Sequence, residues 1–337
     1  MPVKSFRDAL NEAMRLEMRR DPRVVLIGED IVGGIGGAGE MAVDPWGGVM
    51  GVTKGLIGEF GADRVLDTPI SETAYIGAAV GAAATGLRPV AELMFCDFLG
   101  VCFDQIMNQA AKFRYMFGGK VSMPLVIRMQ CGAGFSAAAQ HSQTLHALLT
   151  HIPGLKVVMP SNPYEAKGLL IEAIRDDDPV MFIENKVMYD DKGEVPDEAY
   201  TIPLGVARIA RAGADITICA LGRMVNIAQQ AADLLAKKHI ECTVIDLRCS
   251  SPLDTDTIIE SIEETGHLVV VDEGNPRCGL ASDIAGLAAT SAFFALEAPV
   301  RLVTAPHTPV PFAPVLESLY IPSVERIVEA VEKTLEA

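Results

Sequence analysis

Glu72, Phe98 and His141 each lie in a short stretch that follows a predicted strand. Open α/β sheets bind ligands at the carboxyl ends of their strands, so side chains that follow strands are the first candidates for a site. A carboxylate there can polarise a bound cofactor through a hydrogen bond, and an aromatic ring can stack on a planar heterocycle. A histidine, with a pKa near 6.5, suits proton transfer. These three residues are therefore the first candidates for a functional site.

Each candidate also has a structural interpretation, which the sequence leaves open. Ser71 can cap the helix that follows it, with Glu72 complementing the positive end of the helix dipole. The aromatic residues near Phe98 can belong to the core, and His141 can lie on the surface of a loop. The Ala- and Gly-rich helix after Glu72 packs closely against a sheet under either interpretation.

Residues 34–39 (GIGGAG) match the G-x-G-x-x-G pattern of dinucleotide-binding proteins and follow the predicted strand 24–29. The context disagrees, because the sequence continues through Pro45, Trp46 and two glycines instead of opening a helix. No acidic residue closes a second strand about 20 positions later. A glycine-rich surface loop is the favoured interpretation, and a nicotinamide or flavin site is the alternative. The sequence also has no G-x-x-x-x-G-K-[ST] motif and no G-D-G motif followed by Asn, and so no evident phosphate anchor.

Composition limits the class of protein. A chain of 337 residues with 50% hydrophobic residues is long enough for about two globular domains. The net charge is 28 − 44 = −16, which disfavours binding to nucleic-acid phosphates or anionic membranes. Seven cysteines without a C-x-x-C pair predict neither a disulfide framework nor a cysteine-based zinc site. The N-terminus does not resemble a signal or transit peptide, so we expect a soluble cytoplasmic protein.

Short β-branched runs alternate with amphipathic runs in the first half, a pattern typical of βαβ units around a parallel sheet. The predicted strands are 24–29, 64–68, 89–93, 125–129, 156–159 and 180–184. The best-marked helix follows Asn162, an N-cap, with Pro163 at its first position and Glu165 three residues after the cap.

Residues 186–203 are polar and acidic, contain two prolines and show no apolar period, so we interpret them as the connection between two domains. The predicted domains are residues 1–185 and 204–337. In the second domain the predicted strands are 216–221, 242–247 and 268–272, and the predicted helices are 225–236, 254–264 and a last one that begins near Ser323.

Six blocks in order across nearly the whole chain resemble the β subunits of heterotetrameric, thiamine-diphosphate-dependent 2-oxoacid dehydrogenase (E1) components. The blocks are LIGED (26–30), DTPISE (67–72), GLRP (86–89), QHSQ (140–143), PGLKVV (153–158) and PSN (160–162). Within this family, WGGVMGVTKGL (46–56) and AELMFCDF (91–98) are most similar to the acetoin-cleaving branch.

The resemblance implies a transketolase-like α/β fold, with a pyrimidine-binding parallel-sheet domain followed by a C-terminal transketolase-type α/β domain. It also implies an E1 α subunit that holds the diphosphate and Mg²⁺ in an α₂β₂ heterotetramer, which agrees with the missing G-D-G motif. The E2 lipoyl acyltransferase is the further partner, and its lipoamide receives the acetyl group.

The resemblance assigns roles to individual residues. Glu72 matches the glutamate that hydrogen-bonds N1′ of the aminopyrimidine, and Phe98 matches the aromatic residue that packs on that ring. Glu29 matches an acidic residue close to the ring, and His141 a histidine that faces the reacting carbon. A structural K⁺ in some relatives is bound by main-chain oxygens, and the matching positions are Leu125, Ala173, Ile174, Asp176 and Asp178. Asp178 departs from the expected Asn, and a solvated acidic loop is the alternative there.

The implied reaction is the cleavage of acetoin to acetaldehyde and a two-carbon unit that passes to lipoamide. The alternatives are a pyruvate or other 2-oxoacid dehydrogenase β subunit, a non-catalytic scaffold that docks E2 through an acidic C-terminal domain, and the nicotinamide oxidoreductase that residues 34–39 suggest.

Overall fold

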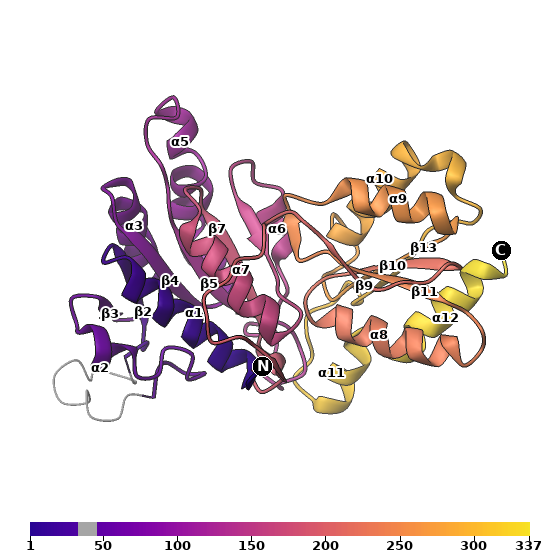
Figure 1. Cartoon of the computed structure of the whole chain (residues 1–337), viewed down its shortest axis with the longest axis horizontal. Coiled ribbons are helices and arrows are strands. Elements are labelled where there is room, and N and C mark those ends of the chain that lie inside the picture. The colour runs from indigo at the N-terminus through magenta and orange to yellow at the C-terminus, as the bar shows by residue number, and fades with distance from the viewer. Residues whose placement is uncertain (33–45) are drawn as a thin grey trace. The chain divides into compact units, whose positions relative to one another are not determined.

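The computed structural model describes residues 1–32 and 46–337, so the glycine-rich motif at 34–39 lies outside the described residues. The chain forms two compact units (Figure 1). The N-terminal unit comprises residues 1–130, 151–158 and 162–204, and the C-terminal unit comprises 131–150, 159–161 and 205–337. The segment with His141 thus belongs to the C-terminal unit.

A twisted sheet with the strand order β6-β7-β5-β4-β2-β3 forms the centre of the N-terminal unit. The strands are β2 (Val24–Glu29), β3 (Val65–Thr68), β4 (Arg88–Phe95), β5 (Val126–Cys131), β6 (Lys156–Val158) and β7 (Val180–Asn185). The pairs β2–β3, β2–β4, β4–β5 and β6–β7 are parallel. All residues of β5 and β7 are buried, as expected for strands covered on both faces. The predicted strands are confirmed to within two or three residues at their ends.

Helices of this unit pack on the sheet and lie at its edges. They are α1 (Phe6–Arg20), α2 (Leu56–Phe60), α3 (Glu72–Ala84), η1 (Cys96–Phe98), α4 (Leu99–Asp104), the π-helix η2 (Gln105–Ala110), α5 (Phe113–Met116) and α7 (Pro163–Arg175). The Oδ1 atom of Asn162 accepts a hydrogen bond of 3.0 Å from the N–H of Glu165, which confirms the predicted N-cap of α7. Helices α1 and α7 pack against each other.

The predicted connection 186–203 contains secondary structure. It includes η3 (Lys186–Met188) and β8 (Lys192–Glu194), and β8 pairs antiparallel with β1 (Val3–Ser5). The Nζ atom of Lys4 lies 2.7 Å from Oδ1 of Asp197. The segment therefore packs on the N-terminal unit, which extends to Leu204.

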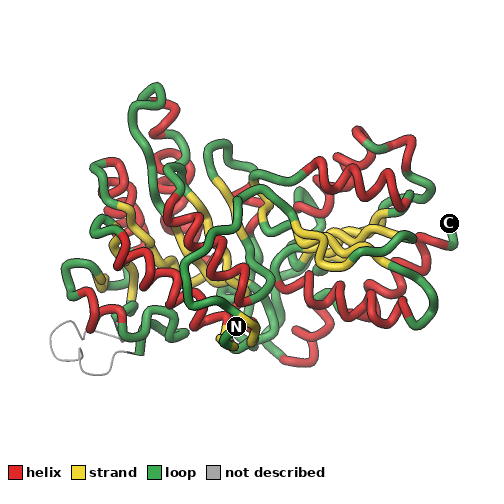
Figure 2. Tube along the Cα trace, viewed as in Figure 1, coloured by secondary structure: helices red, strands yellow, loops and turns green. Residues whose placement is uncertain are grey.

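The C-terminal unit has a second sheet with the order β14-β13-β10-β11-β9 (Figure 2). The strands are β9 (Arg208–Arg211), β10 (Ile216–Ala220), β11 (Cys242–Asp246), β13 (Leu268–Asp272) and β14 (Arg301–Thr304), and β12 (Cys249–Ser251) follows β11 in sequence. Only β9 runs antiparallel to its neighbour in this sheet. The three predicted strands are confirmed, whereas β9, β12 and β14 were not predicted.

Helices cover both faces of this sheet, with α8 and α12 on one side and α9 and α10 on the other (Figure 1). The helices are α6 (His146–Thr150), α8 (Arg223–Ala236), α9 (Thr255–Thr265), α10 (Leu280–Ser291), η4 (Phe293–Ala295), α11 (Pro314–Tyr320) and α12 (Val324–Leu335). The predicted start of the last helix near Ser323 is confirmed, and Ser323 caps α12 through its Oγ atom. The core between β10, β11, α8 and α12 consists mainly of Val, Ile, Leu and Ala side chains, with Met224 and Cys242.

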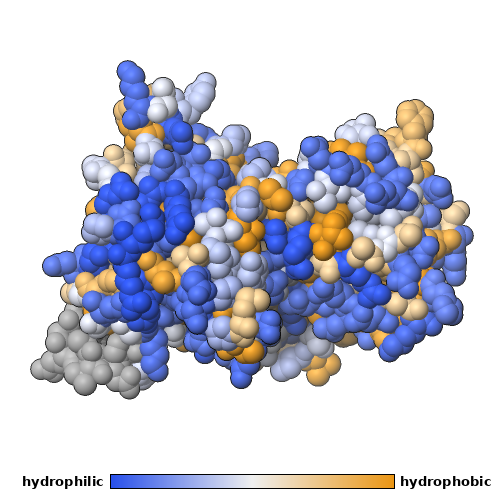
Figure 3. All heavy atoms as spheres, in the orientation of Figure 1, coloured by the Kyte–Doolittle hydropathy of each residue, from blue (hydrophilic) through white to orange (hydrophobic). Residues whose placement is uncertain are grey.

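The face of the molecule in Figure 3 is mainly hydrophilic, with separate apolar areas. Large apolar side chains such as Trp46, Tyr115 and Phe294 are exposed. Tyr115 and Phe117 are more than half exposed, so the interpretation of these rings as core is wrong. Among the described residues, no helix combines the length and the apolar character that crossing a membrane requires.

Candidate active site

Three of the four candidate side chains gather at the carboxyl edge of the N-terminal sheet. Glu29 is the last residue of β2, and its strand position lies opposite Thr68, the last residue of β3. Glu72 begins α3 directly after that strand. Phe98 ends η1, which follows β4 on the other side of β2. Because parallel strands end at the same edge, the order β4-β2-β3 brings these residues to one end of the sheet.

Glu72 is 7% exposed, although it is a charged residue at the start of a helix. Within the described part of the chain its carboxylate forms no hydrogen bond or ion pair. Ser71 does not cap α3, because its Oγ atom instead donates to the carbonyl oxygen of Pro69 at 3.0 Å. The capping interpretation of Ser71 is therefore wrong, and the backbone before α3 leaves Glu72 as the first polar side chain of the helix.

The charge of Glu72 acts on its neighbours, which shows how closely they lie. Burial, and then the charges of Glu72, Asp30 and Asp67, raise the pKa of Glu29. Burial and Glu72 also raise the pKa of Cys102, to about 12, and the pKa of Tyr75. Two carboxylates thus meet at this edge, and the described residues provide no cation in an ion pair with either of them.

Two buried hydroxyl groups at the same edge lack a partner among the described residues, namely Thr68 Oγ1 and Tyr75 Oη. A buried polar atom without a hydrogen bond costs free energy, so such atoms point to a missing ligand or water. Unpaired carboxylates require N–H or O–H donors. A ring that carries a protonated nitrogen and an amino group provides such donors. The aminopyrimidine ring of thiamine diphosphate is of this kind.

Phe98 is held from the strand side by Phe95. The two rings lie edge to face, with centroids 5.6 Å apart and planes at 83°. The Lys186 Nζ atom lies 5.7 Å from the centre of the Phe95 ring. Helix α4 is irregular at Cys102, and the next turn is the π-helix η2. Such irregular turns are frequent at functional sites, and here they follow the aromatic candidate directly.

A buried ion-pair network lies behind this edge. The Arg128 guanidinium is 2% exposed and contacts Glu184 and Glu92, both at 2.7 Å. An added Cβ at Gly28 would lie 2.9 Å from the Glu92 carbonyl oxygen, so β4 approaches β2 closely beside Glu29. Four residues of this region were not predicted from the sequence: Arg128, Glu92, Thr68 and Tyr75. Of these residues, only Tyr75 could have been inferred from its spacing, because a residue three positions after Glu72 lies on the same face of a helix.

His141 belongs to the C-terminal unit and lies in the segment between β5 and α6. The side chain is half-buried. The structure does not bring it together with Glu29, Glu72 and Phe98 within one unit.

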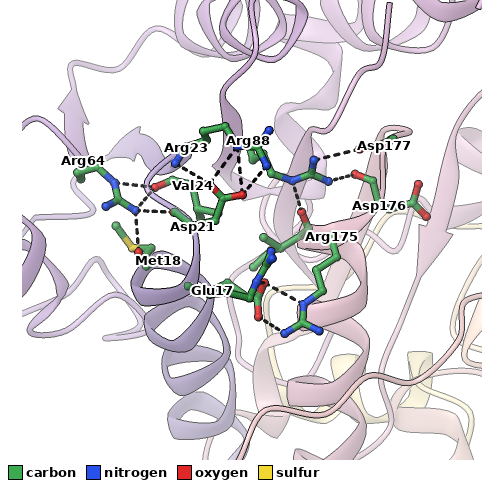
Figure 4. Close-up of polar contacts among 12 residues, drawn as sticks. Glu17, Met18, Asp21, Arg23, Val24, Arg64, Arg88, Arg175, Asp176 and Asp177 are labelled. Carbon is green, nitrogen blue, oxygen red and sulfur yellow. Dashed lines mark hydrogen bonds and ion pairs between the residues drawn. The ribbon is translucent and has the colours of Figure 1, made fainter.

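The backbone oxygens matched to a K⁺ site lie where β5 and β7 begin, at the opposite end of the N-terminal sheet from Glu29 and Glu72. Figure 4 shows Arg88 close to Asp176 and Asp177 in this loop. The Arg88 guanidinium donates to the carbonyl oxygens of Ile174 and Asp176, at 2.9 and 2.6 Å, and to Asp177 Oδ1 at 3.0 Å. The Leu125 carbonyl oxygen accepts from the Val180 N–H at 2.9 Å.

Near the same loop, the Asp178 side chain pairs with Arg114 at 2.6 Å. A guanidinium already supplies positive charge to two of the five positions. K⁺ at Leu125, Ala173, Ile174, Asp176 and Asp178 stays a prediction, and main-chain oxygens are ligands that suit such a hard cation.

Comparisons with known proteins cover both units. A family model described as "Transketolase, pyrimidine binding domain" matches residues 3–192, and "Transketolase, C-terminal domain" matches residues 205–327. The chain is 62% identical to an acetoin:2,6-dichlorophenolindophenol oxidoreductase subunit beta from Cupriavidus necator, over 98% of this chain and 97% of the relative. It is 59% identical to the protein of the same name from Bacillus subtilis, over 97% and 95%.

Other relatives are less similar. A pyruvate dehydrogenase E1 component subunit beta from Rickettsia felis is 44% identical, over 98% of this chain and 97% of the relative. Among solved structures, an inactive β4 tetramer of a split-gene transketolase has a TM-score of 0.77 at 22% identity and covers 98% of both chains. That structural likeness concerns the fold alone.

Proposed function

The chain belongs to the transketolase-like family of thiamine-diphosphate-dependent E1 β subunits, and from this premise we propose that it is the β subunit of an acetoin dehydrogenase. Together with an α subunit it cleaves acetoin to acetaldehyde, and the remaining two-carbon unit passes as an acetyl group to lipoamide on E2. The relatives named for acetoin, at 62 and 59% identity, support this substrate over pyruvate.

The observation that carries the proposal is the buried carboxylate of Glu72, which lies beside Glu29 and lacks a partner among the described residues. Thiamine diphosphate, when bound, supplies a nucleophilic carbon that adds to the ketone and takes up the electron pair left by carbon–carbon cleavage. Glu72 accepts a hydrogen bond from a protonated ring nitrogen of the aminopyrimidine and holds the proton there. Such a hydrogen bond is much stronger in a water-excluded pocket than in water.

The other candidates have supporting roles. Phe98 packs against the aminopyrimidine ring, and its contact with Phe95 fixes the plane of its own ring. Glu29 adds a second acidic group close to Glu72, and burial together with the Glu72 charge raises the pKa of Glu29. His141 holds or moves a proton at the substrate oxygen when the α and β chains together close the site.

We propose residues 1–185 and 204–337 as the two domains, joined by 186–203, and the two matched family models support nearly the same limits. In this proposal the α subunit binds the diphosphate and Mg²⁺ within an α₂β₂ heterotetramer, and the β chain docks on E2. We place the complex in the cytoplasm, since all seven cysteines are free and six of them are buried.

Two alternatives stay testable. A pyruvate or other 2-oxoacid dehydrogenase β subunit would use the same residues on a different substrate. A non-catalytic scaffold that docks E2 would not need Glu72. The α-complemented protein should therefore be assayed with acetoin and with pyruvate, using dichlorophenolindophenol as the electron acceptor, for the wild type, Glu72→Gln and Glu325→Gln.

We expect a clear preference for acetoin and a loss of about 10²-fold or more in kcat for Glu72→Gln, since removing one preorganised hydrogen bond has an effect of this order. Glu325 also lies in the first turn of a helix, α12, but is far more exposed, so Glu325→Gln controls for the loss of a charge at a helix dipole. Faster turnover of pyruvate than of acetoin would show that the enzyme is a pyruvate dehydrogenase and not an acetoin dehydrogenase. Normal turnover by Glu72→Gln would refute the catalytic role.

A further inference from the structure

The segment that carries His141, residues 132–145, has no helix or strand of its own. We call it the histidine segment. Its backbone includes two non-glycine residues with left-handed torsions, Ser136 at φ 52° and Ala138 at φ 62°. Left-handed torsions are unfavourable for residues with a Cβ atom and persist only where the surroundings impose them. Something outside the segment must therefore hold it in this shape.

Glu317 on α11 holds the first half of the histidine segment. Its Oε1 atom accepts from the Gly134 N–H at 2.7 Å, and its Oε2 atom accepts from the Ser136 N–H at 2.9 Å. The Glu317 residue is 2% exposed. Alternate N–H groups that converge on one anion form a backbone nest, and here the anion is a side chain of the same unit. The carboxylate thus binds the backbone where the left-handed torsions begin.

Two further acidic residues hold the ends of the segment. Glu273 accepts from the N–H of Ala133 at 2.7 Å. Beyond His141, the Nε2 atom of His146 lies 3.2 Å from Asp272 Oδ2. The four residues of these two contacts are buried: Ala133, Glu273, His146 and Asp272. Asp272 also accepts a hydrogen bond of 2.8 Å from the N–H of Gly274.

These anchors flank His141 symmetrically in the sequence, with Ser136 five residues before it and His146 five residues after it. The acidic residues come from the end of β13, the residue that follows it, and α11, all in the C-terminal unit. Buried carboxylates are unfavourable unless they are paired, and replacing them with apolar residues would be the simpler way to build a core. Their placement on one segment therefore indicates a purpose beyond packing.

We propose that Glu317, Glu273 and the His146–Asp272 pair are positioning residues, which fix the histidine segment and thereby the place of His141 in the reaction. This inference rests on the proposed role of His141. In this view the C-terminal domain contributes to catalysis by holding a proton-transferring loop. Small displacements of a reacting group are enough to slow an enzyme strongly.

Glu317→Gln tests the proposal in the full-length, α-complemented protein. The amide keeps one acceptor oxygen but turns an NH₂ group toward one of the two backbone donors. Hydrogen exchange measured by mass spectrometry should become about 10-fold or more faster in peptides from the histidine segment, because one backbone N–H loses its acceptor. Exchange in β13 should not change. The kcat for acetoin should fall by about 10- to 100-fold.

A double-mutant cycle separates positioning from general destabilisation. If Glu317 acts through His141, the double variant Glu317→Gln/His141→Ala is no slower than His141→Ala alone. If Glu317 only stabilises the fold, the factor by which kcat falls in the double variant should equal the product of the factors in the two single variants. Glu329→Gln is the matched control, since Glu329 pairs with Lys333 on the exposed side of α12 and should change neither exchange nor kcat.

His146→Gln probes the other end of the segment and serves as the second variant if Glu317→Gln does not fold. It should give the same pattern of faster exchange and non-additivity with His141→Ala. Unchanged exchange in both variants, or fully multiplicative losses of kcat, would overturn the positioning proposal alone. Normal turnover by His141→Ala would instead show that the proposed role of His141 is wrong, and the positioning proposal would fall with it.

Discussion

The Arg128 guanidinium binds both carboxylate oxygens of Glu184, with Nε–Oε1 at 2.7 Å and Nη2–Oε2 at 2.8 Å. The two residues come from the neighbouring strands β5 and β7 and are at most 2% exposed. The third nitrogen of the guanidinium donates to Glu92 on β4 at 2.7 Å. Burial raises the pKa of Glu92, the Arg128 charge opposes this, and the net shift is upward. This network joins β4, β5 and β7. Phe98 lies in η1, which follows β4, and Glu29 ends β2, which pairs with β4.

Removing the Arg128 guanidinium should lower the stability of the fold, because the buried carboxylates of Glu184 and Glu92 would lose the cation that pairs with them. We expect Arg128→Met to lower the free energy of unfolding by about 3–5 kcal/mol. Arg211→Met is the control, since Arg211 pairs with the exposed Asp233 and should cost less than about 1 kcal/mol. Urea unfolding of the full-length chain measures both variants. Equal losses would show that the buried network contributes no more than a surface ion pair.

Tyr75 and Tyr189 provide a second comparison. The Tyr75 Oη atom is buried without a partner in the described part of the chain, whereas the Tyr189 Oη atom donates to Glu184 at 2.7 Å. Tyr75→Phe should therefore leave the thermal midpoint of the free chain unchanged or raise it, and Tyr189→Phe should cost about 1.5–3 kcal/mol, the range for hydrogen bonds to charged groups. Calorimetry of the two variants decides this. A large loss from Tyr75→Phe would reveal a partner for its hydroxyl in the free chain.

The sequence predicts the elements of this fold because their signals are local. Asn162 and Pro163 mark the start of α7, and continuous apolar runs mark the parallel strands. The antiparallel strand β9 escaped prediction because its side chains are only partly buried and its pairing with β11 depends on residues about 35 positions away. Burial patterns identify central strands, whereas an edge strand is defined by its partner.

The candidate site was harder to predict from the sequence than the helices and strands. Glu72 was identified from its place after a predicted strand, and Glu29 only through the family resemblance. Nothing local indicates that Glu72 would be buried without a partner among the described residues, or that Ser71 would leave α3 uncapped. The contact between Glu317 and the backbone of Gly134 joins residues 183 positions apart. Such contacts depend on the tertiary fold, and no spacing rule along the chain reveals them.

Glu29 should give the free chain an unusual pH dependence. Burial and the charges around it raise its pKa, so its protonated form favours the folded state. This contribution is fully present below the pKa of an unfolded glutamate, about 4.3, and is lost as the pH rises through the raised value. Glu29→Gln, which stays neutral, should therefore raise the thermal midpoint at pH 7.5 and change it little near pH 4.

Glu59→Gln is the control, because its expected effect on the thermal midpoint at pH 7.5 has the opposite sign. Burial would raise the Glu59 pKa, but hydrogen bonds from Arg19 and Arg15 outweigh this and lower it. The Glu59 contribution is present above the unfolded pKa and lost as the pH falls, so Glu59→Gln should lower the midpoint at pH 7.5 and have little effect in acid. Thermal scans at several pH values test both variants. A lower midpoint for Glu29→Gln at pH 7.5 would contradict the prediction.

The His146–Asp272 pair should make the anchoring of the histidine segment sensitive to pH. Burial lowers the pKa of His146, but the charges of Asp272 and Glu273 outweigh this and raise it. Burial raises the pKa of Asp272, and His146 together with backbone N–H groups of Gly274 and Ala281 outweighs this and lowers it. The charged pair therefore persists over a wider pH range than either group alone would allow.

The sign of the effect follows from the raised histidine pKa. The stabilisation by His146 is fully present below its unfolded value, about 6.5, and is lost as the pH rises through the folded value. The midpoint difference between the wild type and His146→Gln should thus be large at pH 5.5 and shrink toward pH 9. Calorimetry of the full-length chain measures it, and His307→Gln, which removes an exposed histidine, should show no such trend. A difference that grows with pH would mean that the neutral imidazole, and not the ion pair, holds the segment.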